Sequence, residues 1–144
     1  MVWGAIGHNY KSPLVIIDGG VTAAVYQRDM LPHIDKALRR RKAARRFMHD
    51  GAKPHSARTT TRWLEGKGIR TLAWPAHSPH LNPIEKFWNT LHQKVAKLEP
   101  QSTEDLKEKV LAVWDAITFK EINSYLPIFD KGIPRTIALK GAPW

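Results

Sequence analysis

The spacing of apolar residues along the chain predicts short strands first and longer helices later. Two apolar, β-branched runs, VWGAIG at 2–7 and PLVIIDGG at 13–20, flank the segment HNYKS, and the second run ends in Asp-Gly. This pattern is typical of a β-hairpin. From Thr22 the apolar residues recur at helical spacing with Pro32 among them, which predicts a broken helix to about Arg41.

The middle of the chain alternates strands with helices. Residues 45–51, RRFMHDG, predict a short strand that ends at Asp50, and residues 69–74, IRTLAW, predict another. Between them, residues 55–68 predict a helix that is stopped by Gly66 or Gly68. Because strands that alternate with helices form mixed sheets with helices on their faces, the expected fold class is α/β.

The second half of the chain predicts helices. A helix that begins at Pro83 has one apolar face, formed by Ile84, Phe87, Trp88, Leu91, Val95 and Leu98. Ser102 predicts the N-cap of the next helix, whose apolar face carries Leu106, Val110, Val113, Trp114 and Ile117. A short helix is expected at about 122–129. No repeat or linker indicates a second domain, so we expect a single domain over 1–130 and a tail over 131–144.

The charge balance favours polyanionic partners. The 144 residues include 23 Lys plus Arg against 13 Asp plus Glu, a net charge of +10, which makes nucleic acid the first partner to consider. The most basic stretch is 36–46, and its candidate nucleic-acid-binding residues are Arg39, Arg40, Arg41, Lys42, Arg45 and Arg46. Cations at the C-terminus of a helix explain this stretch equally well, because they oppose the negative end of the helix dipole.

Several classes of function find no support in the sequence. The absence of cysteine excludes disulfides, thiolate zinc sites and a cysteine nucleophile. No apolar run approaches the roughly 20 residues that span a bilayer, and the first residues lack the layout of a signal peptide. His77 and His80 have a ligand-like interval but belong to no zinc motif, and no Ser-His-Asp set or glycine-rich phosphate loop is present.

Two carboxylates are the candidates for chemistry. Asp50 ends a predicted strand, where ligands gather in α/β sheets, although an Asp before Gly51 is common in a turn and, taken singly, favours a structural role. Glu85 is the third residue of a helix that begins with Asn82 as N-cap and Pro83, a position where a carboxylate also serves as a capping group. If strand 69–74 lies beside the strand of Asp50, the two carboxylates can meet and hold Mg²⁺ or Mn²⁺.

The segments around both carboxylates resemble a known family. HDGAKPHSA and WLEGKGIRTLAWPAHSPHLNPIEKFW are similar to the catalytic domain of the mariner-like DDE transposases, and the resemblance runs from about Trp3 through the tail. The 34 residues between Asp50 and Glu85 (85 − 50 − 1) are similar to the spacing in one branch of that family.

The resemblance implies an RNase H-like, retroviral integrase-like fold and a two-metal site that cuts and joins DNA. Asp50 would be the second metal ligand and Glu85 the third, with His55 and Asn82 as loop-supporting residues. The implied cofactor is Mg²⁺ or Mn²⁺, and the implied partners are DNA at transposon ends and further copies of the chain, with no membrane. The implied location is the nucleus in a eukaryote and otherwise the cytoplasm with the DNA.

The chain also departs from the family pattern. Gly51 stands where the family usually has Asn, and His80 stands where it usually has Asp. The family places its first ligand on a strand ahead of the Trp-Gly strand, whereas here VWG follows Met1 directly, and Asp18 is the best-placed replacement. We therefore expect a gapped or rearranged sheet without its first, central strand, and a catalytic fragment that binds metal weakly and is inactive alone. The alternative is a basic nucleic-acid-binding module without catalysis.

Overall fold

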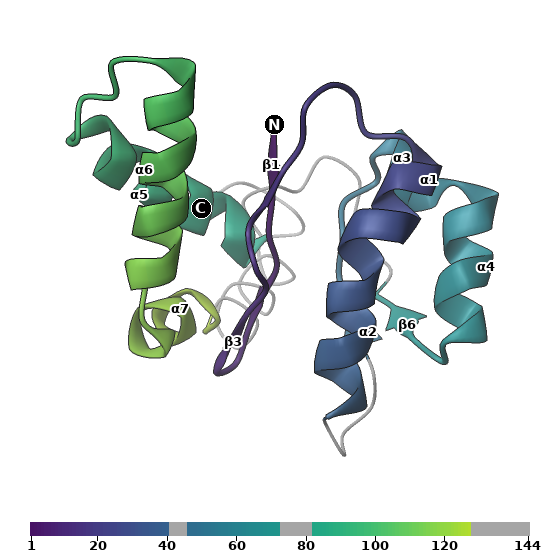
Figure 1. Cartoon of the computed structure of the whole chain (residues 1–144). Coiled ribbons are helices and arrows are strands. Elements are labelled where there is room, and N and C mark those ends of the chain that lie inside the picture. Colours follow the sequence, from purple (N-terminus) through teal and green to yellow (C-terminus); the bar gives the residue numbers. More distant parts are fainter. Residues whose placement is uncertain (41–45, 73–81, 128–144) are drawn as a thin grey trace, which may run out of the picture. The chain divides into compact units, whose positions relative to one another are not determined.

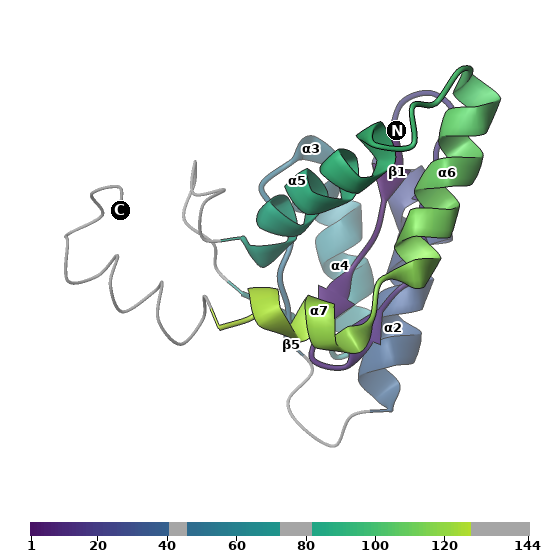
Figure 2. The same cartoon turned by 90° about the vertical axis from the view of Figure 1, so that its left-hand side faces the viewer.

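The computed structural model describes residues 1–40, 46–72 and 82–127, which are coloured in Figures 1 and 2. The chain divides into two compact units, the first formed by Met1–Ala5 and Ser12–His77 and the second by Ile6–Lys11 and Ser78–Trp144. Each unit is described by itself below. The predicted tail, residues 131–144, lies outside the described residues.

The predicted hairpin forms, but as two short ladders whose registers differ by one residue. β1 (Val2–Trp3) pairs antiparallel with β4 (Val15–Ile16) in the first unit. β2 (Ile6–Gly7) pairs antiparallel with β3 (Tyr10–Lys11) in the second. The strands expected over 2–7 and 13–20 are therefore each interrupted.

A bulge at Ser12 and Pro13 produces the change of register. Gly4 and Ala5 separate the two ladders on one side of the hairpin, whereas Ser12, Pro13 and Leu14 separate them on the other. Ser12 donates its backbone N–H to Ala5 O at 2.8 Å, and its hydroxyl accepts from Ala5 N at 2.9 Å. Pro13 has no N–H to offer a ladder, so it is tolerated where pairing is already broken.

The first long helix is broken as predicted. It runs from α1 (Ala23–Val25) through a π-helical segment, η1 (Tyr26–Met30), into α2 (Leu31–Arg39), and Figure 1 shows these segments following one another. Thr22 caps the start, accepting from Val25 N through its hydroxyl. The wide turn lies directly before Pro32, which has no N–H to donate and would clash in a regular helix.

The two remaining strands of the first unit run parallel, as the α/β pattern requires. β5 (Arg46–Phe47) pairs with β6 (Arg70–Thr71), and Leu72 N extends the pairing by donating to Phe47 O at 2.9 Å. Two helices connect them, α3 (Lys53–Ser56) and α4 (Arg58–Gly66). The single helix expected over 55–68 thus begins earlier and breaks at Ala57, whose ψ of 138° is extended.

Gly68, rather than Gly66, terminates α4. Its φ of +65° lies in the left-handed region, which glycine adopts without strain. Gly68 N donates to Glu65 O at 2.8 Å and Ile69 N donates to Leu64 O at 2.9 Å, the pair of bonds that defines a Schellman motif. Leu64 and Ile69 then join the core of the unit, whose buried members are Ile17, Tyr26, Met30, Leu31, Leu64 and Ile69.

The sheet is divided, as expected. Across residues 1–40, 46–72 and 82–127 every ladder contains two strands, and none joins the β1–β4 pair to the β5–β6 pair. The prediction of a gap between the hairpin and the two parallel strands is therefore confirmed for the described residues.

The second unit packs three helices around aromatic residues. These are α5 (Pro83–Ala96), α6 (Thr103–Ala116) and α7 (Phe119–Tyr125), seen together in Figure 2. The Trp114 ring meets Phe87 edge-on at 5.4 Å and stacks on Trp88 at 5.5 Å between centroids. The helix expected at about 122–129 begins earlier and ends at Tyr125.

The predicted apolar faces of α5 and α6 are correct at their centres and wrong at one end of each. Phe87, Leu91 and Trp114 are buried, but Leu98 is 46% exposed and Leu106 is 41% exposed. Leu98 lies past the end of α5, in the turn where Glu99 takes a positive φ of 49°. Leu106 lies in the first turn of α6.

Lys11 attaches the β2–β3 hairpin to the end of α6. Its ammonium group donates to the carbonyl oxygens of Trp114, Asp115 and Ile117 at 2.5, 2.8 and 2.8 Å. These acceptors include orphan carbonyls at a helix C-terminus, where a cation is also favoured by the dipole. The hairpin and the three helices therefore form one body.

Candidate active site

Asp50 lies in the loop after β5, and local hydrogen bonds fix its carboxylate. Its Oδ1 accepts from Ala52 N at 3.0 Å and from His55 Nδ1 at 2.5 Å. The first bond folds the chain back after Asp50, and the second connects the loop to α3. The Asp50 side chain is still 59% exposed, and Oδ2 accepts no hydrogen bond from the described residues. One oxygen thus orients the carboxylate, while the other is left without a hydrogen bond in that part of the chain.

A cluster of rings supports His55 from the protein interior. Tyr26 is completely buried, and its ring centroid lies 4.2 Å from that of His55. The His49 ring is nearly parallel to that of His55, at 5.1 Å between centroids. The Tyr26 hydroxyl lies 3.2 Å from His49 Nδ1. The contacts of His55 therefore connect Asp50 to the core of the first unit.

Sequence reasoning missed Tyr26 and His49 as members of this site. Tyr26 falls among the apolar residues that recur at helical spacing after Thr22, a pattern that agrees with its burial but says nothing of its hydroxyl group. His49 directly precedes Asp50, and its place in the short predicted strand was the only available signal.

Burial and hydrogen bonding set the charges at this site. Partial burial alone would raise the pKa of Asp50, but the Ala52 N–H and the neighbouring His55 outweigh it and hold that pKa below its usual value. Burial, and to a lesser extent the neighbouring His55, lower the pKa of His49 to about 4, while Asp50 opposes both. Burial also raises the pKa of Tyr26. At neutral pH, Asp50 is therefore ionised, while His49 and Tyr26 are neutral.

Glu85 lies on an exposed turn at the start of α5. The Asn82 side chain accepts from Ile84 N at 3.3 Å, and Pro83 occupies the first helical position, as predicted. Glu85 N donates to Asn82 O at 3.1 Å. The carboxylate of Glu85 is exposed and makes no hydrogen bond within the described parts of the chain, so a return bond to the Asn82 amide is not seen there.

The two carboxylates have the donor chemistry of a magnesium or manganese site. Asp50 belongs to the first unit and Glu85 to the second, and each presents anionic oxygen to solvent within its own unit. Mg²⁺ takes one or two carboxylates and completes its shell with water and substrate phosphates, so each of these carboxylates has the donor chemistry of a ligand to such an ion. No group of three or more His, Asp or Glu residues that could hold a metal occurs among the described residues.

The other predicted residues are only partly described. Arg39 and Arg40 end α2, and Arg46 is exposed in β5, whereas Arg41, Lys42 and Arg45 lie outside the described residues. His77 and His80 lie outside them as well. Asp18, the candidate replacement for a first ligand, is exposed in the turn after β4.

Comparisons with known proteins give one consistent result. The profile of the DDE superfamily endonucleases matches residues 1–107. The chain is 30% identical to the Tc3 transposase of Caenorhabditis elegans over 147 residues, covering 99% of this chain and 44% of that protein. It is 28% identical to the Tcb2 transposase of Caenorhabditis briggsae, covering 99% of this chain and 53% of the relative. The chain thus spans about half the length of the curated relatives it matches.

Solved structures agree on the fold. The chain matches the catalytic domain of the Mos1 mariner transposase with a TM-score of 0.71 at 22% identity, over 94% of this chain and 70% of that one. The Mos1 catalytic domain with raltegravir and Mn gives a TM-score of 0.70 at 23% identity, over 94% and 71%. This likeness confirms the predicted RNase H-like α/β fold. The matched profile covers most of the chain and includes both Asp50 and Glu85, so the chain belongs to the DDE superfamily endonuclease family, and its relatives are transposases.

Proposed function

We propose that this chain forms part of the catalytic region of a DDE transposase, which cleaves DNA and transfers the cut strand with the help of divalent metal ions. The observation that carries the proposal is the presence of two exposed carboxylates inside the matched residues 1–107: Asp50, whose Oδ1 is fixed by local hydrogen bonds, and Glu85, whose backbone lies in the capped first turn of α5. Exposed carboxylates held in place by backbone geometry are suited to binding a hard cation.

The proposed ions are Mg²⁺ or Mn²⁺, bound through Asp50 and Glu85. The Mos1 catalytic domain has been solved with each of these metals, which supports the choice. A bound divalent ion supplies Lewis-acid activation of water and of the scissile phosphate. His55 holds the Asp50 carboxylate in one orientation through Oδ1, and the other oxygen is then available as a ligand.

The proposed substrate is DNA, because the relatives are transposases and the net charge of +10 attracts a polyanion. In a eukaryotic host this substrate would place the protein in the nucleus. Within the described residues, no helix is long and apolar enough to cross a membrane.

Nicking of supercoiled plasmid DNA tests the proposed chemistry. The chain alone is expected to nick weakly or not at all, and any nicking that appears in Mg²⁺ or Mn²⁺ should be lost in Asp50→Asn and in Glu85→Gln. The matched controls are Glu65→Gln and Glu108→Gln, which neutralise exposed carboxylates on α4 and α6. Metal-dependent nicking that survives both site substitutions would contradict the assignment.

A second candidate function is a basic nucleic-acid-binding module without catalysis, and the net charge of +10 favours it. Salt-sensitive DNA binding by a chain that neither nicks DNA nor binds Mn²⁺ would establish this module in place of the enzyme.

A further inference from the structure

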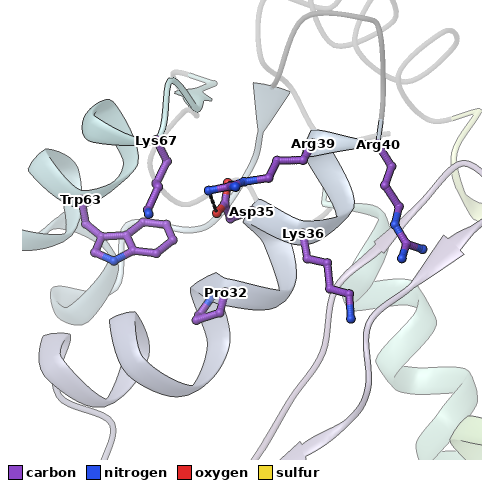
Figure 3. A pocket seen from close by; sticks show the side chains of 7 residues that line it. All are labelled: Pro32, Asp35, Lys36, Arg39, Arg40, Trp63 and Lys67. Carbon is purple, nitrogen blue, oxygen red and sulfur yellow. Dashed lines mark hydrogen bonds and ion pairs between the residues drawn. The ribbon is translucent and has the colours of Figure 1, made fainter.

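Outside the predicted metal ligands, the first unit contains an open hollow of about 520 Å³ between the end of α2 and the end of α4. Figure 3 shows its lining: Pro32, Asp35, Lys36, Arg39 and Arg40 come from the α2 side, while Trp63 and Lys67 come from the α4 side. Most of these residues are charged, whereas pockets for small organic ligands are mainly apolar. The lining of the hollow therefore favours a charged ligand.

The lining carries an excess of positive charge. Four cations, Lys36, Arg39, Arg40 and Lys67, surround it, and all four residues are exposed. Among the described residues that line the hollow, Asp35 is the one acid, and it is already neutralised by Arg39, whose guanidinium group lies 2.8 Å from Asp35 Oδ2 (Figure 3). Four cations and one acid give the lining of the hollow a net charge of +3 (4 − 1).

Trp63 gives one of these cations a defined place. The Lys67 ammonium lies 5.6 Å from the centroid of the Trp63 ring, a cation–π arrangement. Trp63 in turn packs against the core of the unit. The ring therefore holds the flexible Lys67 side chain beside the hollow, on the side opposite α2 in Figure 3.

Helix dipoles alone do not account for this arrangement. A cation at each helix C-terminus is favourable, which explains basic residues at the end of α2 and at the end of α4 separately. It does not require the two ends to share a hollow. In Figure 3 the four cations are also spread from Lys67 across the α2 turn to Arg40 instead of converging on a single point. A row of phosphates fits such a stripe better than a single small anion does.

We infer that this hollow binds the phosphate backbone of duplex DNA, through Lys36, Arg40 and Lys67 with the Arg39–Asp35 pair between them. Duplex DNA presents about one negative charge per 1.7 Å of its axis, so a stripe of cations meets several phosphates at once. Arg39 fixes the nearly buried Asp35 and thereby shapes the stripe. The inference rests on the proposed function, because DNA as the polyanion follows from it, and it adds a contact surface apart from the metal ligands.

Salt-dependent binding of a fluorescein-labelled duplex of arbitrary sequence tests the inference. Fluorescence anisotropy is measured on the full chain between about 50 and 200 mM salt in EDTA, so that metal chemistry does not contribute. The variant is Lys36→Gln/Arg40→Gln/Lys67→Gln, which leaves the Arg39–Asp35 pair intact. The control is Arg62→Gln/Lys97→Gln/Lys120→Gln, which removes the same charges from exposed positions that do not line the hollow.

Each lost phosphate contact reduces the slope of log K against log salt by about 0.9, so three contacts reduce it by about 2.7. Over a fourfold change in salt, the loss of affinity of the variant should then be about 40-fold smaller than that of the wild type. The control triple variant should keep a slope close to that of the wild type.

Two results would overturn the inference, and they are distinguishable. If the wild type binds DNA but both triple substitutions change the slope of log K against log salt by the same amount, the hollow is not the contact surface, while the proposed function stands. If the wild type does not bind the duplex at all, the inference fails together with the proposed substrate. Circular dichroism of both variants establishes that they are folded.

Discussion

Protonation of His49 should destabilise the first unit as the pH falls. This loss of stability should begin at a pH well above the one at which Asp50 takes up a proton. The His49 ring lies 5.1 Å from Phe47 and 5.1 Å from His55 between centroids, and its Nδ1 is 3.2 Å from the Tyr26 hydroxyl. These surroundings favour the neutral ring, and burial lowers its pKa from 6.5 to about 4. The folded state therefore binds this proton less readily than the unfolded state does.

The sign and size of the effect follow from linkage. Below pH 6.5 the unfolded chain gains a proton that the folded chain does not, so stability is complete above pH 6.5 and is lost as the pH falls toward 4. The full shift corresponds to about 3.4 kcal/mol at 1.36 kcal/mol per pH unit, and about 2 kcal/mol of it is lost by pH 5. Because the ring is only partly buried, solvent screening reduces this to about 1–1.5 kcal/mol at pH 5.

Urea unfolding at pH 7 and pH 5, together with an NMR titration of the histidine ring protons, measures this loss. We expect His49 to titrate near pH 4, and His49→Gln to remove most of the stability difference between the two pH values. His92→Gln, at an exposed position, should leave the difference unchanged. Asp50 does not interfere, because its pKa is below its ordinary value of 3.8. A His49 titration near 6.5 in the folded protein would refute the reasoning.

Three further substitutions test the local structure, each by urea unfolding. Lys11→Met should lower the free energy of unfolding by about 1–2 kcal/mol, because it removes three charge-assisted hydrogen bonds to the end of α6. The control, Lys97→Met at an exposed position, should change it little. Equal effects of the two substitutions would contradict the capping role of Lys11. Gly68→Ala should lower the free energy of unfolding by about 1 kcal/mol, because its φ is +65°; no loss would argue against the left-handed turn. Asn82→Ala should lower the free energy of unfolding by about 1 kcal/mol, because it removes the N-cap of α5. The same substitution should weaken Mn²⁺ binding through Glu85. An unchanged Mn²⁺ affinity would mean that the cap does not position Glu85.

Local signals in the sequence predicted the elements that depend on a few residues. Asn82 and Pro83 indicate the start of α5, and a glycine after Leu64 indicates the end of α4, because caps and left-handed turns need particular side chains. Pro32 indicated the break in the first helix. The bulge at Ser12 was not predictable, because it depends on a side-chain hydroxyl taking the place of a ladder acceptor across the hairpin.

The candidate site was predictable in part for the same reason. Asp50, His55 and Glu85 lie in motifs that can be read along the chain. The residues that support Asp50 could not be predicted from such motifs. Tyr26 contacts His49 and His55, but it lies in a segment more than twenty positions earlier in the chain. The residues that support an active site in three dimensions leave no spacing pattern, so a buried aromatic residue is read only as part of the core.

The most direct test of the account is whether Asp50 and Glu85 bind the same metal. Mn²⁺ binding to the full chain, followed by electron paramagnetic resonance, is compared for Asp50→Asn, Glu85→Gln and the double variant. If both carboxylates serve one pocket, each single substitution should weaken binding strongly and the double variant should be little worse than either, a coupling expected of groups that share a ligand. Losses that simply add, or Mn²⁺ binding that neither substitution affects, would contradict a shared site.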